Sequence, residues 1–321
     1  MGELRIERYE SAYKALWDDF VRQSKNGTFL FRRDYMEYHA DRFDDFSLLF
    51  FEDDKLVALL PANVTPSGAV SHGGLTYGGV VCGSSMKTSL MLQVFEALLA
   101  RLRTEGIAQL IYKAVPHIYH RLPAEEDLYA LFVHGAQLFR RDISAAILME
   151  KRLPLSKGRK SEIKKAAHLS IAESADFDTF MTMEEAVLLE RHNKKPVHSA
   201  AELRSLAQAF PDHIKLFAAH DGVEMLGGIV MYTDEMVAHA QYISATPEGK
   251  RNGAQDAILN YLINEVYRDR RYFDFGISTE DEGRYLNLGL QQNKESYGAR
   301  AVTYDFYRLD LASSGSQQPR G

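Results

Sequence analysis

A single lysine stands near the end of the chain in the segment GLQQNKESYGAR, residues 289–300. Lys294 is surrounded by amide and small side chains, and it lies four positions before Gly298. An ammonium group in this setting has two interpretations. It is either an ordinary solvated surface charge, or it is directed at an atom that acquires negative charge during a reaction, where a fixed cation would stabilise the transition state.

A glycine-containing turn, SATPEGKRNGAQDAI at residues 244–258, runs from a predicted strand into a predicted helix. Gly249 and Gly253 permit close approach of the backbone, and the start of the helix offers N–H groups and the positive end of its dipole. The turn therefore predicts a phosphate-binding site, although it matches neither the P-loop nor the dinucleotide fingerprint. The residues predicted to bind the phosphate of a cofactor are Lys250, Arg251, Asn252, Gly253 and Ala254.

Polar side chains also occur on two predicted strands beside this turn. Asp274 alternates with Phe273 and Phe275, so it faces away from both. It is interpreted either as a general base or as an anchor for a neighbouring backbone turn. His239 and Tyr242 lie three positions apart, which places them on opposite faces of a strand. Tyr242 is nearer the turn and is the predicted substrate contact.

Two further pairs of residues are predicted to contact substrate. Arg191 and His192 follow an amphipathic helical segment, where they contact an acceptor or form a solvated helix end. His72 and Tyr77 flank glycines in SHGGLTYGG, which forms a glycine-lined wall for a ligand or a tight strand connection.

The sequence offers no other familiar catalytic centre. His117 and His120 lack a neighbouring carboxylate motif, so no metal site is predicted. No Gly-x-Ser-x-Gly element indicates a hydrolase triad. Cys82 is the only cysteine, and it stands in an apolar, strand-like run where a buried structural thiol is expected.

Two segments of the chain share one order of elements. The first begins with an apparent hairpin at residues 48–64 and the second with one at residues 214–233. In each, a strand, a glycine-rich turn, an amphipathic helix and a further strand follow. An offset of about 165 residues is too long for a solenoid repeat and fits a duplicated domain. The predicted fold class is α/β, of the α+β type with mixed sheets, in two tandem domains.

The composition sets limits on domain number and on partners. A chain of 321 residues accommodates two domains. The net charge of −6 argues against a DNA-binding protein. No apolar run is long enough to span a bilayer, and the first residues lack the apolar core of a signal peptide, so a cytoplasmic protein without stable membrane insertion is expected.

The predicted domains are residues 1–150 and 151–311, followed by a polar tail, 312–321, that is expected to be disordered. The basic segment LSKGRKSEIKKAAHLS begins the second domain. It is interpreted as a solvated linker helix, or as a basic lip for a ligand that carries phosphate.

The element order and the GKRNGA turn resemble the GNAT acyltransferase superfamily. Lys250 and Gly253 fall in register with the superfamily's phosphate-binding turn, whereas Gln255 replaces a small residue. The segments SKGRKSEIKKA, FDFGIS and GLQQNKESYGA together are similar to the FemAB-like branch, which has two GNAT-like domains in one chain. Lys294 stands where ordinary GNAT enzymes often carry a tyrosine. The resemblance extends to about Leu311.

This resemblance implies an N-acyl transfer in which an amine attacks an activated ester or thioester. It implies that Lys294 and Asp274 are catalytic, that the second domain binds the donor, and that the first lies on the acceptor side. The expected donor is acyl-CoA, acetyl-CoA or longer, with no metal. The expected acceptor is the amine of a small molecule or of a cell-envelope or polysaccharide precursor.

Two alternatives remain open. The first is an aminoacyltransferase of the FemAB type that uses charged tRNA as donor. The second belongs to a different class, a non-catalytic module that binds a nucleotide-sugar or an acyl carrier, and the imperfect GKRNGAQ turn motivates it.

Overall fold

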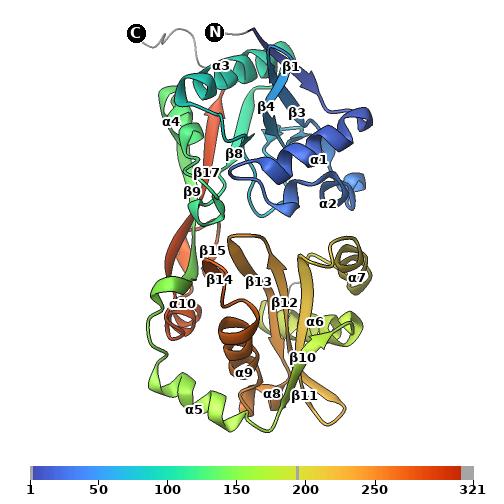
Figure 1. Cartoon of the computed structure of the whole chain (residues 1–321), viewed down its shortest axis with the longest axis vertical. Coiled ribbons are helices and arrows are strands. Elements are labelled where there is room, and N and C mark those ends of the chain that lie inside the picture. Colours follow the sequence, from blue (N-terminus) through green and yellow to red (C-terminus); the bar gives the residue numbers. More distant parts are fainter. Residues whose placement is uncertain (1–2, 193–194, 312–321) are drawn as a thin grey trace. The chain divides into compact units, whose positions relative to one another are not determined.

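The computed structural model describes residues 3–192 and 195–311, and these residues fall into two compact units (Figure 1). Unit 1 comprises the chain up to Asp142, Asp281–Arg284 and the chain from Thr303 onward. Unit 2 comprises Ile143–Glu280 and Tyr285–Val302. The domain boundaries expected at residues 150 and 311 stay predictions. The tail expected at residues 312–321 lies outside the described residues.

Unit 1 contains two groups of paired strands, in the orders β1-β3-β4-β7 and β17-β8-β6-β5-β2. Its strands are β1 (Leu4–Arg8), β2 (Asp44–Asp45), β3 (Leu48–Glu52), β4 (Lys55–Leu60), β5 (Asn63–Thr65), β6 (Gly68–Val70), β7 (Val81–Cys82), β8 (Gln109–Lys113), the first part of β9 (Gln137–Leu148) and the last part of β17 (Arg300–Asp310). Its α-helices are α1 (Lys14–Gln23), α2 (Arg33–Glu37), α3 (Thr88–Thr104) and α4 (Glu126–Val133), and its short 3-10 helices are Ser11–Tyr13, Phe29–Phe31, Ala40–Arg42 and His117–Tyr119.

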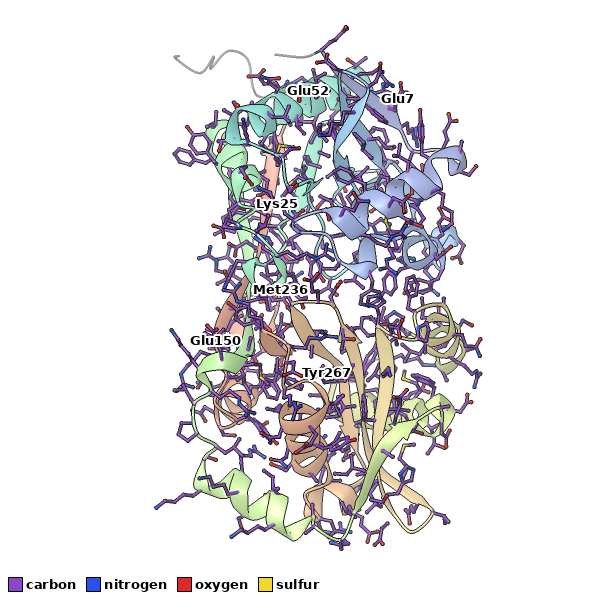
Figure 2. The ribbon with its side chains drawn as sticks, viewed as in Figure 1. Glu7, Lys25, Glu52, Glu150, Met236 and Tyr267 are labelled. Atoms are coloured by element: carbon purple, nitrogen blue, oxygen red, sulfur yellow. The ribbon has the colours of Figure 1, made fainter. Side chains whose placement is uncertain are left out.

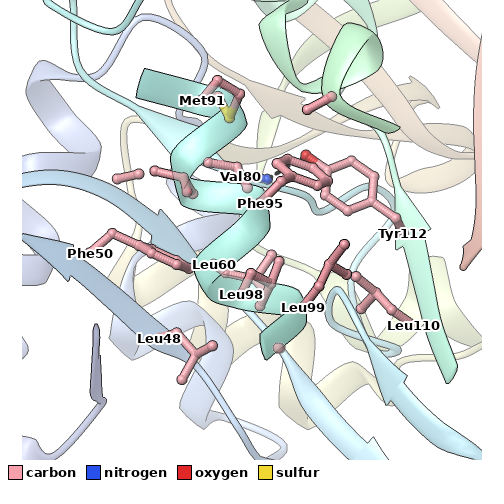
Figure 3. Close-up of a cluster of buried hydrophobic side chains, with 14 of the residues drawn as sticks. Leu48, Phe50, Leu60, Val80, Met91, Phe95, Leu98, Leu99, Leu110 and Tyr112 are labelled. Atoms are coloured by element: carbon pink, nitrogen blue, oxygen red, sulfur yellow. Dashed lines mark hydrogen bonds between the residues drawn. The ribbon is translucent and has the colours of Figure 1, made fainter. Parts of the chain in front are cut away.

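Helix α3 supplies much of the core of unit 1. As its apolar spacing predicts, Met91, Val94 and Leu98 are buried. Together with Phe95 they meet strand residues such as Phe50 and Leu60 in one cluster (Figure 3). Burial of each such side chain contributes about 1.5–3 kcal/mol relative to exposure. This packing holds the strands of unit 1 in place.

Unit 2 is built on a six-stranded order, β10-β11-β12-β13-β14-β9. Its strands are β10 (Ser170–Ser174), β11 (Ile214–Asp221), β12 (Glu224–Thr233), β13 (Val237–Ala245), β14 (Tyr272–Ile277), the short pair β15 (Thr279–Glu280) and β16 (Tyr285–Leu286), and parts of β9 and β17. Its helices are α5 (Lys157–Lys165), α6 (Phe177–His192), α7 (Ala200–Ala209), α8 (Pro247–Arg251), α9 (Ala254–Tyr261), which continues as a π-helix (Leu262–Val266), and α10 (Leu288–Glu295), with a 3-10 helix at Met149–Lys151.

Helices cover both faces of the unit 2 sheet. Ile229 and Met231 of β12 share a buried cluster with residues of α9 and with Tyr267, which is labelled in Figure 2. On the opposite face, Phe180 of α6 packs against Gly228, where a β-carbon would lie 2.5 Å from the ring. The face toward α6 and α7 and the face toward α9 are therefore distinct environments for strand residues.

The two units repeat one order of elements. An edge strand, β1 or β10, pairs antiparallel with the first strand of a hairpin, β3–β4 or β11–β12. A third strand, β7 or β13, pairs with the hairpin, and a helix, α3 or α9, leads to β8 or β14. Unit 1 adds the hairpin β5–β6. This repetition confirms the predicted tandem α/β architecture.

Candidate active site

The two parallel strands of unit 2, β13 and β14, separate soon after they begin. Their register pairs Val237 with Tyr272, Ala238 with Phe273 and His239 with Asp274, and in the described part of both strands it stops there. Gly276 then adopts a left-handed φ of 77°, and the pairing of β14 with β9 shifts between Asp274 and Ile277. A left-handed residue and a register shift bend a strand, so backbone groups beyond His239 face a splayed region.

Lys294 lies at this splayed region. Helix α10, which carries it, begins at Asn287, whose side chain accepts a hydrogen bond from the Leu290 amide at 3.0 Å. The Lys294 Nζ donates to the carbonyl oxygens of Gly276 at 2.8 Å and Ile277 at 2.7 Å. Only 5% of the residue is exposed, which excludes the solvated surface lysine.

Burial lowers the pKa of Lys294 to about 8, against a smaller opposing effect of the Asp274 carboxylate. An ammonium group has three N–H donors, and the two carbonyls account for two of them. Lys294 is thus a buried, strongly held cation whose pKa lies well below the ordinary value for lysine.

Asp274 is fully buried and holds several partners at once. Its Oδ1 accepts hydrogen bonds from the Ser144 hydroxyl at 2.5 Å and the Gly276 amide at 3.2 Å, while its Oδ2 lies 2.7 Å from the His239 Nδ1. The contact with Gly276 shows the predicted anchoring of a neighbouring turn. The contact with His239 places an imidazole ring beside the carboxylate, although the sequence favoured Tyr242 over His239 as the site residue of this strand.

His239 and Tyr242 lie on the same face of the sheet, so the prediction that they point to opposite faces is wrong. Tyr232 pairs with His239 and Val230 pairs with Tyr242 across β12 and β13. Residues 230 and 232 share a face because side chains alternate along a strand, and so their partners share it too. A β-bulge at Gln241 inserts the extra residue that changes the alternation.

Tyr242 itself is buried, with its hydroxyl 2.7 Å from the Nδ1 of His198. His198 precedes α7 and is also buried. The predicted substrate contact of Tyr242 stays a prediction, but the structure gives the residue a partner that no spacing in the sequence indicated, since the two are 44 positions apart.

The predicted phosphate-binding turn is divided between two environments. Lys250 lines a pocket, and Arg251 is exposed. Gly253, with a φ of 74°, lies against α5: a β-carbon there would sit 2.6 Å from the Glu162 carbonyl oxygen. Ala254 is completely buried and Asn252 is half-buried. Gly253 and the start of α9 therefore form a contact with α5 rather than an open cradle.

Helix α5 is fixed over α9 by charged contacts. Arg159 donates to the Asp256 carboxylate at 2.9 Å and to the Ser296 hydroxyl at 2.8 Å. The Tyr297 hydroxyl donates to the same carboxylate at 2.8 Å, and the Arg159 guanidinium lies 4.7 Å from the Tyr297 ring centre. These contacts tie α5 to both α9 and the end of α10.

A pocket of about 580 Å³ adjoins the turn on the α6 side. Helix α6, the β11–β12 hairpin and the end of β13 form its walls. Its lining residues are Asp176, Thr179, Thr182, Met183, Ala186, Val187, Glu190, His220, Val223, Glu224, Met225, Ala245, Thr246, Pro247 and Lys250.

In unit 1, His72 and Tyr77 are both buried. His72 has a φ of 59° and lines a separate pocket of about 390 Å³ with Arg33, and burial lowers its pKa to about 3. The Tyr77 hydroxyl donates to the Thr28 hydroxyl at 3.1 Å. Burial raises the pKa of Cys82 to about 12, as a structural thiol requires.

Arg191 and His192 end α6, but their side chains lie outside the described part of the structure. Among the residues that the structure describes, no cluster of His, Cys, Asp and Glu could hold a metal ion. None of the helices in the described ranges has the length and apolar character needed to cross a membrane.

Comparison with known proteins finds a family match for part of the chain. A family model for the acetyltransferase (GNAT) domain matches residues 156–285. No curated protein matches the sequence.

Solved structures resemble nearly the whole chain in fold. A structure of FemX is 11% identical, with a TM-score of 0.66 over 94% of this chain and 96% of that one. A conserved protein from Bacteroides thetaiotaomicron is 12% identical, with a TM-score of 0.62 over 96% and 100%. The C-terminal domain of a protein described as a lysylphosphatidylglycerol synthetase from Agrobacterium fabrum is 12% identical, with a TM-score of 0.61 over 95% and 94%.

These identities are low, so the solved structures establish the fold alone. Residues 156–285 thus match the acetyltransferase (GNAT) domain model, and the chain as a whole is similar in fold to the solved structure of FemX.

Proposed function

We propose that this chain is an N-acyltransferase whose unit 2 joins an activated acyl carbonyl to an amine where β13 and β14 separate. One observation carries the proposal: a buried lysine, Lys294, is held by two backbone carbonyls at that separation. The GNAT domain match supports the reaction class. We also propose, from the sequence, that the protein is located in the cytoplasm.

Lys294 would act on the oxygen of the acyl carbonyl. When the amine nitrogen bonds to the carbonyl carbon, that oxygen becomes an oxyanion, and a preorganised N–H donor stabilises it more than it stabilises the ground state. The third donor of the ammonium group is the one available for this role. Because its partners already fix the side chain, little reorganisation accompanies the reaction.

The donor is defined by its chemistry, an activated ester or thioester. Acyl-CoA is the donor that the sequence predicts. However, the residues expected to hold its pyrophosphate do not fit that role as arranged, because Gly253 and Ala254 are covered by α5 and the core. No step is therefore assigned to a CoA group at this turn.

Aminoacyl-tRNA is the second candidate donor, and the surface of α5 favours it. Lys157, Lys160 and Lys164 of this helix are exposed, as is Arg251 of the adjoining turn. Such a surface attracts a phosphate backbone without an enclosed pocket. One structurally similar protein is described as a lysylphosphatidylglycerol synthetase, so lipid acceptors belong in the test beside small-molecule amines and envelope precursors.

The full-length protein should be incubated with donors and acceptors, and the products detected by mass spectrometry. The donors are acetyl-CoA, longer acyl-CoAs and aminoacyl-tRNAs. The acceptors are amino sugars, peptidyl amines and phosphatidylglycerol vesicles. We expect an acyl-modified product that requires both substrates and decreases at least tenfold with Lys294→Ala. Lys215→Ala, a lysine of β11 paired with Glu173, serves as the control.

Binding of a nucleotide-sugar or acyl carrier without any product from these pairs would instead identify a non-catalytic module. Product from aminoacyl-tRNA but from none of the thioesters would identify the aminoacyltransferase.

A further inference from the structure

His239 has the geometry of a catalytic base. Its Nδ1 lies 2.7 Å from the Asp274 Oδ2, and an ionised carboxylate only accepts hydrogen bonds, so Nδ1 carries the proton. The neutral imidazole then has its lone pair on Nε2. The side chain is 14% exposed, whereas Asp274 is fully buried.

The carboxylate that orients His239 is itself rigidly held. The Ser144 hydroxyl and the Gly276 amide occupy Oδ1, and the imidazole occupies Oδ2. A buried carboxylate without such partners would be strongly unfavourable. With them, Asp274 fixes both the tautomer and the direction of the ring, in the way that an acidic partner orients a catalytic histidine.

The location is also specific. His239 and Asp274 form the last matched pair of the two parallel strands before these separate. The ring of His239 adjoins Gly276, where a β-carbon would lie 3.3 Å from Cε1. Gly276 is the residue whose carbonyl holds the Lys294 Nζ. One bent backbone segment thus connects the histidine to the lysine.

We propose that His239 is the general base that takes the proton from the acceptor amine, with Asp274 and Ser144 as positioning residues. This inference rests on the proposed N-acyl transfer. It reassigns the base role that the sequence predicted for Asp274, because a fully buried carboxylate cannot contact a substrate. The His239 side chain, which is partly exposed, can contact one.

The step balances as a proton shuttle. The neutral amine donates its lone pair to the acyl carbon, and one of its N–H protons passes to the His239 Nε2 as the N–C bond forms. The carbonyl π electrons move to oxygen and return when the C–S or C–O bond breaks. The leaving thiolate or alkoxide then takes the proton from the imidazolium, which regenerates the neutral ring.

Several groups set the charge around this ring. The Asp274 carboxylate lies against the His239 Nδ1, and the Lys294 ammonium is held by the carbonyl of the adjoining Gly276. Tyr232, the cross-strand neighbour, and Tyr242 share the face of His239. A general base must be unprotonated to act, so the dependence of activity on pH should differ between the wild type and a variant without the imidazole.

Kinetics of His239→Ala test the base role. We expect kcat to fall about 10²–10⁴-fold for alkylamine acceptors, and added imidazole to restore part of it. With hydroxylamine, which is neutral at working pH and needs less help from a base, the loss should be smaller. His213→Gln is the matched control, because that half-buried histidine bonds the Thr233 carbonyl. An equal loss with both acceptors and no rescue would overturn the proposal.

Nitrogen-15 NMR of the imidazoles separates this inference from the proposed function. At neutral pH His239 should show a protonated Nδ1 and an unprotonated Nε2, and Asp274→Asn should alter this pattern. A protonated Nε2 in the wild type would overturn the base assignment whether or not turnover is found. A wild type with no N-acyl product from any donor would refute the proposed function, while the tautomer would still decide whether His239 can accept a proton.

Discussion

At the scale of single residues, the buried lysines Lys113 and Lys294 have similar partners but different surroundings. Lys113 of unit 1 donates from Nζ to the carbonyls of His72 and Leu75, and burial lowers its pKa to about 7, with a further lowering by Arg140. Lys294 has two carbonyl acceptors as well, yet a carboxylate rather than a guanidinium acts on it. Hydrogen bonds from Nζ to two backbone carbonyls are thus compatible with a purely structural lysine. Lys294 differs from Lys113 because it lies where β13 and β14 separate and because the Asp274 carboxylate acts on it.

The activity of Lys294 variants should reveal a transition-state role. Lys294→Ala should lower kcat about 10²–10³-fold, as loss of an oxyanion donor does, with a smaller change in KM, because the interaction is made mainly in the transition state. Lys294→Arg keeps the charge but changes the donor geometry, so it should recover only part of kcat. Steady-state kinetics under saturating donor and acceptor measure both. A KM increase with unchanged kcat would instead place Lys294 on acceptor phosphate.

The stability of the protein should depend on the ionisation of Lys294. Burial lowers its pKa from 10.5 to about 8, so the unfolded chain binds more protons between these values. The free energy of unfolding should therefore rise as pH increases from about 8 to about 10.5. The gap corresponds to about 3 kcal/mol. Lys294→Met should lack this contribution.

Urea unfolding of the wild type and Lys294→Met across that pH range provides the measurement. Parallel dependences of the two proteins on pH would show that the lysine is not held as described.

At the scale of elements, local patterns predicted the strands and helices well and their side-chain directions less well. The turn at Asp53 and Asp54 and the helix that ends before Gly106 follow from residue type and spacing. Local sequence does not predict that His239 and Tyr242 share a face. The bulge at Gln241 arises from the pairing of β13 with β12, and no local sequence pattern shows that pairing.

The candidate site was predictable only in part for the same reason. The sequence predicts Lys294 through the family resemblance and Asp274 from its strand position, and their roles stay predictions. No sequence pattern indicates Ser144, which reaches Asp274 across 130 positions. The local sequence around Gly253 predicts a phosphate-binding glycine. That sequence cannot show that α5 packs on this residue.

Substitution of Gly253 should therefore affect stability more directly than donor binding. Gly253→Ala combines an unfavourable positive φ with a β-carbon 2.6 Å from the Glu162 carbonyl. Gly222→Ala is the matched control, since it has a φ of 57° but nothing within 4 Å of its β-carbon. The control should lose about 1 kcal/mol from the strained backbone, and Gly253→Ala about 1–3 kcal/mol more.

Chemical denaturation of the two variants measures the difference. Equal losses would mean that α5 moves away without penalty and that the turn can open to a ligand.

At the scale of the whole molecule, neither unit is a continuous stretch of chain. Unit 2 begins at Ile143, so it includes the second half of β9, which pairs with β14 at Leu148 and Ala146. β14 carries Asp274, and the candidate site therefore depends on a strand that precedes residue 150.

Two fragments test this dependence. A fragment of residues 143–311 should unfold cooperatively, whereas residues 151–311 should melt at least several degrees lower or aggregate. The shorter fragment leaves β14 without its neighbour β9 and Asp274 without the Ser144 hydroxyl. Circular dichroism and thermal melts compare them. Equal melting temperatures would place the functional boundary near residue 150 after all.

The pairing of β8 with β17 has a consequence for biosynthesis. Five residues of β8, Gln109–Lys113, match Asp310–Phe306 in register, and nearly the entire second unit is translated between them. A ribosome that adds roughly 5–20 residues per second separates the two strands by about 10–40 seconds. During that interval one edge of β8 stays open in the nascent chain, which makes unit 1 the part of this protein most dependent on chaperone protection until translation has passed residue 310.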